Sequence, residues 1–180
     1  MRWLKRTTSI VAIASIIGFS AQAVTFAEEV GSIPNEEISC LAKNIYFEAK
    51  NQGTGGWLAV SFVTLNRVKD SRYPNTICEV VYQGQTRPSW QDPEIMIPTR
   101  HRCQFSWYCD GKSDEIKNQS KYMDILLFTN HMLGQATSTN MIDITDGATH
   151  YHADYVKPAW ASTKTKTIEI GDHIFYRWEK

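Results

Sequence analysis

The chain has 180 residues, of which 42% are hydrophobic, 12% aromatic and 21% charged, with ordinary numbers of glycine and proline. This composition excludes a disordered, collagenous or low-complexity protein, and the length suits one domain with a targeting segment. The formal net charge is 0, so the overall charge does not indicate a nucleic acid as a partner.

The first 23 residues have the three parts of a secretory signal peptide. The chain starts with three basic residues, continues with an apolar run at 7–20, and reaches a small-x-small cleavage site that ends at Ala23. The apolar run is too short to cross a bilayer comfortably. We therefore expect cleavage after Ala23, export to a periplasm or out of the cell, and no stable membrane span in the mature protein. A cut after Ala27, an uncleaved anchor and a buried N-terminal helix are the alternatives.

The first two expected helices follow a polar lead-in at 24–35. Asn35 is the expected N-cap of a helix over residues 36–50, in which apolar residues recur at helical spacing. A second helix, at about 55–69, is apolar almost all round, which predicts a buried central helix.

The middle of the chain is less regular. Residues 76–82 fit a short helix or an extended piece, and residues 84–111 read as a long irregular loop of the kind that usually carries function. A third helix is expected from Ser113 to about Leu133, closed by Gly134.

The C-terminal part has strand patterns. Ala148–Ala153 fits a short strand, and Thr165–Ile170 and His173–Arg177 alternate around Gly171-Asp172, a two-residue hairpin turn. Helices followed by a small antiparallel sheet make an α+β fold, in one domain over residues 36–180.

Four cysteines in an exported chain suggest two disulfides. Three pairings exist; we favour Cys103 with Cys109, which closes a short loop and leaves Cys40 with Cys78. A metal site that uses His101 with Cys103 and Cys109 is an alternative, but it lacks a CxxC knuckle.

Glu48 is the sharpest candidate for chemistry. It falls at the margin of the apolar face of the first helix, where partial burial would raise the pKa of the carboxyl and keep it protonated, as a general acid requires. An ordinary surface glutamate, paired with Lys43 or Lys50, is the alternative.

Two further clusters carry polar and aromatic groups. The run Cys103–Cys109 includes Gln104, Phe105, Ser106 and Trp107, whose rings and polar groups could form a sugar-binding rim or an aromatic core. His150 and His152 lie on one face of the expected strand, beside Tyr151 and ahead of Trp160. They suit a wall of a groove or a two-histidine metal site without an obvious third ligand.

Seven blocks of the chain form a recognisable series, at Leu41–Gly53, Val63–Val68, Tyr73–Tyr82, Cys103–Gly111, Ala148–Ala153, Pro158–Trp160 and Ile170–Arg177. Taken in order, they resemble the bacterial cell wall hydrolases related to the spore cortex-lytic enzymes. The first block is LAKNIYFEAKNQG, and the chain carries Phe47 where many relatives have glycine.

The resemblance implies a lysozyme-like helical core and cleavage of the glycan strand of peptidoglycan, with Glu48 as the catalytic acid. We expect a lytic transglycosylase that acts between N-acetylmuramic acid and N-acetylglucosamine, as a monomer with peptidoglycan as its partner and without a metal or cofactor. The expected groove contacts are Gln104, Ser106, Tyr151 and His152, and the expected stacking rings are Phe105, Trp107 and Trp160. The alternatives are a hydrolytic muramidase with Asp110 or Asp154 as second carboxylate, a zinc amidase using the histidines, and a wall-binding module without catalysis.

Overall fold

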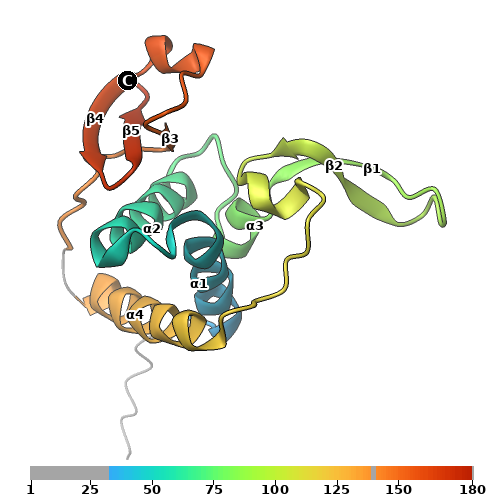
Figure 1. Cartoon of the computed structure of the whole chain (residues 1–180), viewed down its shortest axis with the longest axis horizontal. Coiled ribbons are helices and arrows are strands. Elements are labelled where there is room, and N and C mark those ends of the chain that lie inside the picture. Colours follow the sequence, from blue (N-terminus) through green and yellow to red (C-terminus); the bar gives the residue numbers. More distant parts are fainter. Residues whose placement is uncertain (1–32, 139–140, 180) are drawn as a thin grey trace, which may run out of the picture. The chain divides into compact units, whose positions relative to one another are not determined.

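The computed structural model describes residues 33–138 and 141–179 (Figure 1). The expected signal peptide and most of the lead-in therefore lie outside the described residues. The helices of the described part are α1 (Asn35–Ala49), α2 (Gly53–Lys69), α3 (Ile77–Val81), α4 (Gln119–Ser138) and the short 3-10 helices η1 (Ser106–Cys109) and η2 (Ala159–Thr163). The strands are β1 (Gly84–Pro88), β2 (Met96–Cys103), β3 (His150–Ala153), β4 (Thr165–Ile170) and β5 (His173–Arg177).

The helical core forms around α1, which packs against α2, α3 and α4. The expected apolar face of α1 is buried, with Leu41 and Ile45 at 0% exposure. The prediction that Asn35 is the N-cap of α1 is wrong. Asn35 is already helical, Pro34 precedes the helix, and no side chain caps this end. The carboxylate of Glu37 instead accepts hydrogen bonds from the backbone N–H groups of Ile77 and Cys78, so it caps α3.

Helix α2 is the buried central helix that its composition predicts. The turns in the middle of α2 are not exposed to solvent. Trp57 Nε1 donates a hydrogen bond to the Ala49 carbonyl at 3.0 Å, which connects the end of α1 to α2. Among the described helices, none is long and apolar enough to cross a membrane.

The expectation of an irregular segment at 84–111 is wrong, because most of it is a β-hairpin. Strands β1 and β2 pair antiparallel, and a register shift lies between Gly84 and Thr86 (Figure 1). Every residue of β1 is exposed. A strand with no buried face has no alternation of apolar and polar residues, so its sequence carries no periodic signal.

Helix α4 begins later and ends later than expected. The side chain of Asn118 accepts a hydrogen bond from the N–H of Lys121, so Asn118 caps the helix in place of Ser113. The helix continues through Gly134, because a glycine within a helix lowers its stability by only about 1 kcal/mol and does not have to end it.

The expected C-terminal hairpin is confirmed in its exact bounds. The sheet has the order β3-β5-β4, and all neighbours are antiparallel. Gly171 has a φ of 58°, and the N–H of Asp172 donates to Gln52 Oε1 at 3.0 Å. Gln52 follows α1 in the chain, so this contact joins the hairpin turn to the helical core. On the same side, Phe175 is buried against Ala59 and Val63 of α2.

The favoured disulfide pairing is the one in the structure. Cys40 of α1 is bonded to Cys78 of α3, and Cys103 at the end of β2 is bonded to Cys109 at the end of η1. The second bond closes the short segment that carries Gln104 and Ser106.

Candidate functional site

Glu48 lies in the last turn of α1, where its carboxyl meets the sheet. Tyr151 of β3 donates a hydrogen bond from its hydroxyl to Glu48 Oε2 at 2.9 Å. The two residues are 103 positions apart, and the register of β3 with β5 places Tyr151 opposite Phe175. The Tyr151 ring packs on Phe175 and His173, which fixes the direction of its hydroxyl. The surface pair with Lys43 or Lys50 is not formed.

Burial raises the pKa of Glu48, while the hydrogen bond from Tyr151 and the positive charge of Arg67 act in the opposite direction. Burial also raises the pKa of Tyr151, and the neighbouring Glu48 raises it further. The phenol therefore stays protonated and remains a donor. A half-buried carboxyl whose pKa is raised is suited to general acid chemistry.

Two adjoining cavities meet at Glu48. The first has a volume of about 400 Å³, and the second of about 260 Å³. The first is lined by Glu48, Arg67, Gln104, Ser106, Tyr151, His152, Ala153, Tyr155 and His173. The second is lined by Phe47, Glu48, Ser106, Trp107, Asp110, Lys112, Ser113 and Asp114. Since Glu48 and Ser106 line both, the two cavities adjoin at the acid.

The structure brings together five of the residues singled out in the sequence: Glu48, Gln104, Ser106, Tyr151 and His152 all line the first cavity. Trp107 lines the second cavity but is only 7% exposed. Its ring stacks on Phe47 with 4.7 Å between centroids, and its Nε1 donates to the buried Asn44 at 2.9 Å. Trp107 therefore offers an edge to the cavity and not an open face.

Two of the expected stacking rings are placed elsewhere. Phe105 is 2% exposed and packs beneath the guanidinium of Arg67, so it belongs to the core and has no face for a sugar. Trp160 does not line either cavity. Its ring contacts His150, His152 and Tyr176. His150 and His152 alternate with Tyr151 along β3, so Trp160 gathers with them on the opposite face of the strand.

Both histidines of β3 have a hydrogen-bond partner in this arrangement. His152 Nε2 lies 3.0 Å from the Tyr176 hydroxyl, and His150 Nδ1 lies 2.9 Å from Thr149 Oγ1. Asp110, one of the two expected second carboxylates, lines the second cavity, whereas Asp154 lines neither.

Four lining residues were not assigned to the site from the sequence: Arg67, Phe47, His173 and Asp114. Arg67 had a recognisable signal, because it is a charged residue inside the helix that is apolar almost all round, and Phe47 directly precedes Glu48. His173 and Asp114 had no such signal, since they reach the cavities through the tertiary fold.

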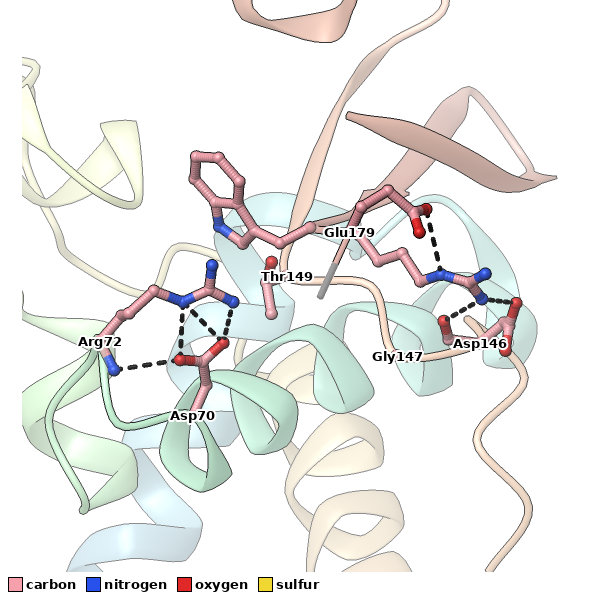
Figure 2. Close-up of a pocket in the computed structure, with 8 residues that line it drawn as sticks. Asp70, Arg72, Asp146, Gly147, Thr149 and Glu179 are labelled. Atoms are coloured by element: carbon pink, nitrogen blue, oxygen red, sulfur yellow. Dashed lines mark hydrogen bonds and ion pairs between the residues drawn. The ribbon is translucent and has the colours of Figure 1, made fainter. Parts of the chain in front are cut away.

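A further depression, of about 480 Å³, lies beside the start of the loop after α2 (Figure 2). Its arginines are held by neighbouring acids: Arg72 is paired with Asp70, and Arg177 with Asp146 and Glu179. These ion pairs lie at the surface, and Glu48 does not line this depression. The chemistry therefore points to the Glu48 cavities.

The family model described as Cell Wall Hydrolase matches residues 51–176, which is more than two thirds of the chain. The chain belongs to the cell wall hydrolase family. Glu48 lies just ahead of the matched range, and the remaining residues that line the first cavity lie inside it.

Curated proteins and solved structures that resemble the chain are both consistent with this family. The chain is 24% identical over 149 residues to a spore cortex-lytic enzyme of Bacillus cereus, an alignment that covers 80% of this chain and 47% of the relative. The chain thus spans about half the length of the curated relatives it matches.

The solved structures share the fold. The catalytic domain of the Bacillus cereus SleB protein matches with a TM-score of 0.55 and 23% identity, over 82% of this chain and 94% of that one. The catalytic domain of a germination-specific lytic transglycosylase, SleB from Bacillus anthracis, matches with a TM-score of 0.55 and 24% identity, over 82% of this chain and 98% of that one. These matches and the observed elements confirm the expected α+β fold, with a helical core and a small antiparallel sheet.

Proposed function

We propose that this member of the cell wall hydrolase family cleaves the glycan strand of peptidoglycan at the β-1,4 bond between N-acetylmuramic acid and N-acetylglucosamine. One observation carries the proposal: Glu48 is a half-buried acid with a raised pKa, held by Tyr151 at the junction of two cavities. The names of its relatives, a cortex-lytic enzyme and a lytic transglycosylase, describe the same kind of polymer chemistry.

In the first step Glu48 donates its proton to the oxygen that bridges the two sugars. Tyr151 occupies Oε2, so the proton is carried by Oε1. The bond from the bridging oxygen to C1 of the muramyl sugar breaks, and positive charge develops at C1. Gln104, Ser106, Tyr151 and His152 line the cavity in which one of the sugars would lie.

In the second step we propose an intramolecular attack, as in a lytic transglycosylase. The 6-hydroxyl of the muramyl sugar forms the new bond to C1, assisted by the N-acetyl group, and its proton returns to the Glu48 carboxylate. The product is a 1,6-anhydro sugar, no water is consumed, and Glu48 is again protonated. One carboxyl group suffices for both steps.

Asp110 supports hydrolysis as the second candidate. It lines the second cavity together with Glu48, and the N–H of Lys112 donates to its carboxylate, which lowers the pKa of Asp110. An ionised carboxylate in this position could activate a water molecule, as in an ordinary glycosidase.

The test is mass spectrometry of fragments that the protein releases from purified peptidoglycan. We expect fragments that end in 1,6-anhydro-muramic acid, and their yield should fall by about 100-fold or more with Glu48→Gln, because that variant keeps the shape and loses the proton. Glu36→Gln, an exposed acid at the other end of α1, is the matched control and should retain activity.

Other products would change the assignment. Reducing-end sugars that disappear with Asp110→Asn would establish a hydrolytic muramidase. Free peptides whose release stops with a chelator and returns with zinc would move the chemistry to an amidase. Tight sedimentation with peptidoglycan without released fragments would leave a binding module.

The location of this activity is part of the proposal. We propose that residues 36–180 form the catalytic domain, that residues 1–23 are a cleaved signal peptide, and that the mature protein acts as a monomer in the periplasm or at the cell wall. Mass determination of the protein recovered from the exporting cell tests the cleavage after Ala23.

A further inference from the structure

Arg67 is a buried cation in the wall of the first cavity. It is 4% exposed, and its Nε donates to the carbonyl of Thr149 at 2.8 Å. Its guanidinium carbon lies 4.8 Å from the ring centroid of Phe105 and 5.4 Å from that of Tyr73. These contacts hold the guanidinium in one place beside Glu48 and Tyr151.

The contacts of Arg67 leave its charge without an adjacent anion. Across residues 33–138 and 141–179, no carboxylate oxygen forms an ion pair with Arg67, and its Nη1 is buried without a hydrogen-bond partner. Burial lowers the pKa of Arg67, but a guanidinium remains charged at physiological pH. A buried charge without an anion is costly, so its retention calls for a compensating group.

Glu48 is the acid that shares the cavity with Arg67. The attraction between the two groups acts on both. We propose that Arg67 is a positioning residue that stabilises Glu48 in its carboxylate form, the form that Glu48 acquires as its proton leaves. The value of this role for catalysis rests on the proposed function, whereas the coupling of the two residues does not.

The proposed role depends on the stage of the reaction at which Arg67 and Glu48 attract each other. While Glu48 is protonated, Arg67 faces a neutral group and gains little. As the proton passes to the bridging oxygen, the carboxylate becomes negative and the attraction to Arg67 grows. An interaction that is stronger in the transition state than in the ground state accelerates the step. Because Thr149, Phe105 and Tyr73 already fix the guanidinium, no rearrangement is needed.

Other groups also face Glu48 and set the background for any pH effect. They come from β3, β5 and the segments that follow β3 and η1. The titratable and charged members are Tyr151, His152, Tyr155, His173, Asp110, Lys112 and Asp114. Arg67 is the one contributed by α2.

The direct test is a titration of the Glu48 carboxyl by carbon NMR, which requires no substrate. Arg67→Met should raise the pKa of Glu48, since it removes a positive charge that lowers this pKa from within the same cavity. Arg67→Lys retains a charge and should give a smaller shift. Arg72→Met removes an exposed arginine outside both cavities and should give none. An unchanged Glu48 titration in folded Arg67→Met overturns the proposal.

A second measurement applies if Arg67→Met folds poorly. In this variant the Glu48 carboxylate loses the positive charge of Arg67. The variant should therefore be less stable at about pH 8 than at about pH 5, by a larger difference than the wild type shows. Adding Glu48→Gln should restore stability at the higher pH. A loss that is equal at both pH values and that Glu48→Gln does not restore indicates a purely structural role and overturns the proposal.

Activity gives a third readout, on peptidoglycan. Arg67→Met should lower kcat about 10- to 100-fold with little change in KM, and the alkaline limb of its pH profile should move to higher pH. If the wild type releases no glycan fragments, the proposed function fails while the titration still decides the coupling. If the wild type is active and Arg67→Met keeps both its kcat and its pH profile, the proposal fails.

Discussion

Glu48 places an ionisable group where the fold disfavours its charge, and this has a measurable effect on stability. Burial raises the pKa of Glu48 above the value of 4.5 that it has when exposed. Between 4.5 and the raised value, the folded state binds more protons than the unfolded state, so the free energy of unfolding falls as pH rises. Glu48→Gln removes this loss.

We therefore expect Glu48→Gln to be more stable than the wild type at neutral pH, while it is inactive. Below about pH 4 both side chains are neutral, and the difference should vanish. Chemical denaturation at a series of pH values measures this. Equal stability at every pH would show that the carboxyl is well solvated in the folded state.

Tyr151→Phe tests the hydrogen bond to Glu48 with little change in packing. The variant keeps the ring contacts with Phe175 and His173 and loses only the hydroxyl that donates to Glu48 Oε2. We expect activity to fall by about 10- to 100-fold, since one hydrogen bond to a charged group contributes about 1.5–3 kcal/mol. The alkaline limb of the pH profile should move upward because the carboxylate loses a donor. Tyr122→Phe, in α4 and outside both cavities, is the matched control.

Among the elements, those that could be predicted are those with a buried face. The alternation in Thr165–Ile170 and His173–Arg177 predicted β4 and β5 exactly, because the strands pair around a two-residue turn and cover α2. The β1–β2 hairpin could not be predicted, because β1 is exposed throughout and its pattern reflects no core.

The residues of the candidate site also differ in whether the sequence could predict them. Glu48 was singled out by its place at the edge of an apolar helix face together with the family resemblance, and Gln104, Ser106 and Tyr151 by their motifs. The assignment of Phe105 as a surface ring failed because an aromatic residue in a loop segment has the same sequence signal whether it points inward or outward. The contact of Glu48 with Tyr151 depends on the packing of α1 against the sheet, which local periodicity does not contain.

The two disulfides should have different effects, because they constrain different elements. Cys40–Cys78 links α1 to α3 across 38 positions, whereas Cys103–Cys109 spans 6 positions and carries Gln104 and Ser106. By loop-closure entropy, removing the longer link should cost about 4 kcal/mol and the shorter about 2.5 kcal/mol.

The loss of activity on removing each disulfide should follow the opposite order to the loss of stability. Cys103→Ser with Cys109→Ser should reduce activity more than the paired substitution at Cys40 and Cys78, when both variants are compared under conditions in which they are folded. Denaturation midpoints and rates of fragment release, measured on the same samples, check this. A larger activity loss from the Cys40–Cys78 variant would show that the short loop needs no covalent closure.

For the whole molecule, His150 predicts a loss of stability in acid. Burial lowers the pKa of His150 from 6.5 to about 4, assisted by the positive charges of Arg67, Lys164 and Arg72. Between these values the unfolded state binds more protons, so the free energy of unfolding falls as pH drops from 6.5 toward 4. Asp143, whose pKa is lowered, contributes only below its ordinary value of 3.8.

His150→Gln should flatten the stability curve across this range, as followed by thermal unfolding at closely spaced pH values. His131→Gln, at an exposed position of α4, is the control and should leave the curve unchanged. Because Glu48 acts in the opposite direction over part of this range, the difference between the two curves decides the prediction. Parallel curves for the wild type and His150→Gln between pH 6.5 and 4 would contradict it.

The hydrogen bond between Tyr151 and Glu48 joins the first described helix to a strand near the end of the chain. During synthesis, the ribosome releases Glu48 about a hundred residues before its partner emerges. Strand β3 then pairs only with β5, the last strand. A nascent or prematurely terminated chain therefore has the acid without the hydroxyl that orients it. The contact between the first described helix and β3 therefore forms only after most of the chain has been synthesised, so it belongs to the late steps of folding.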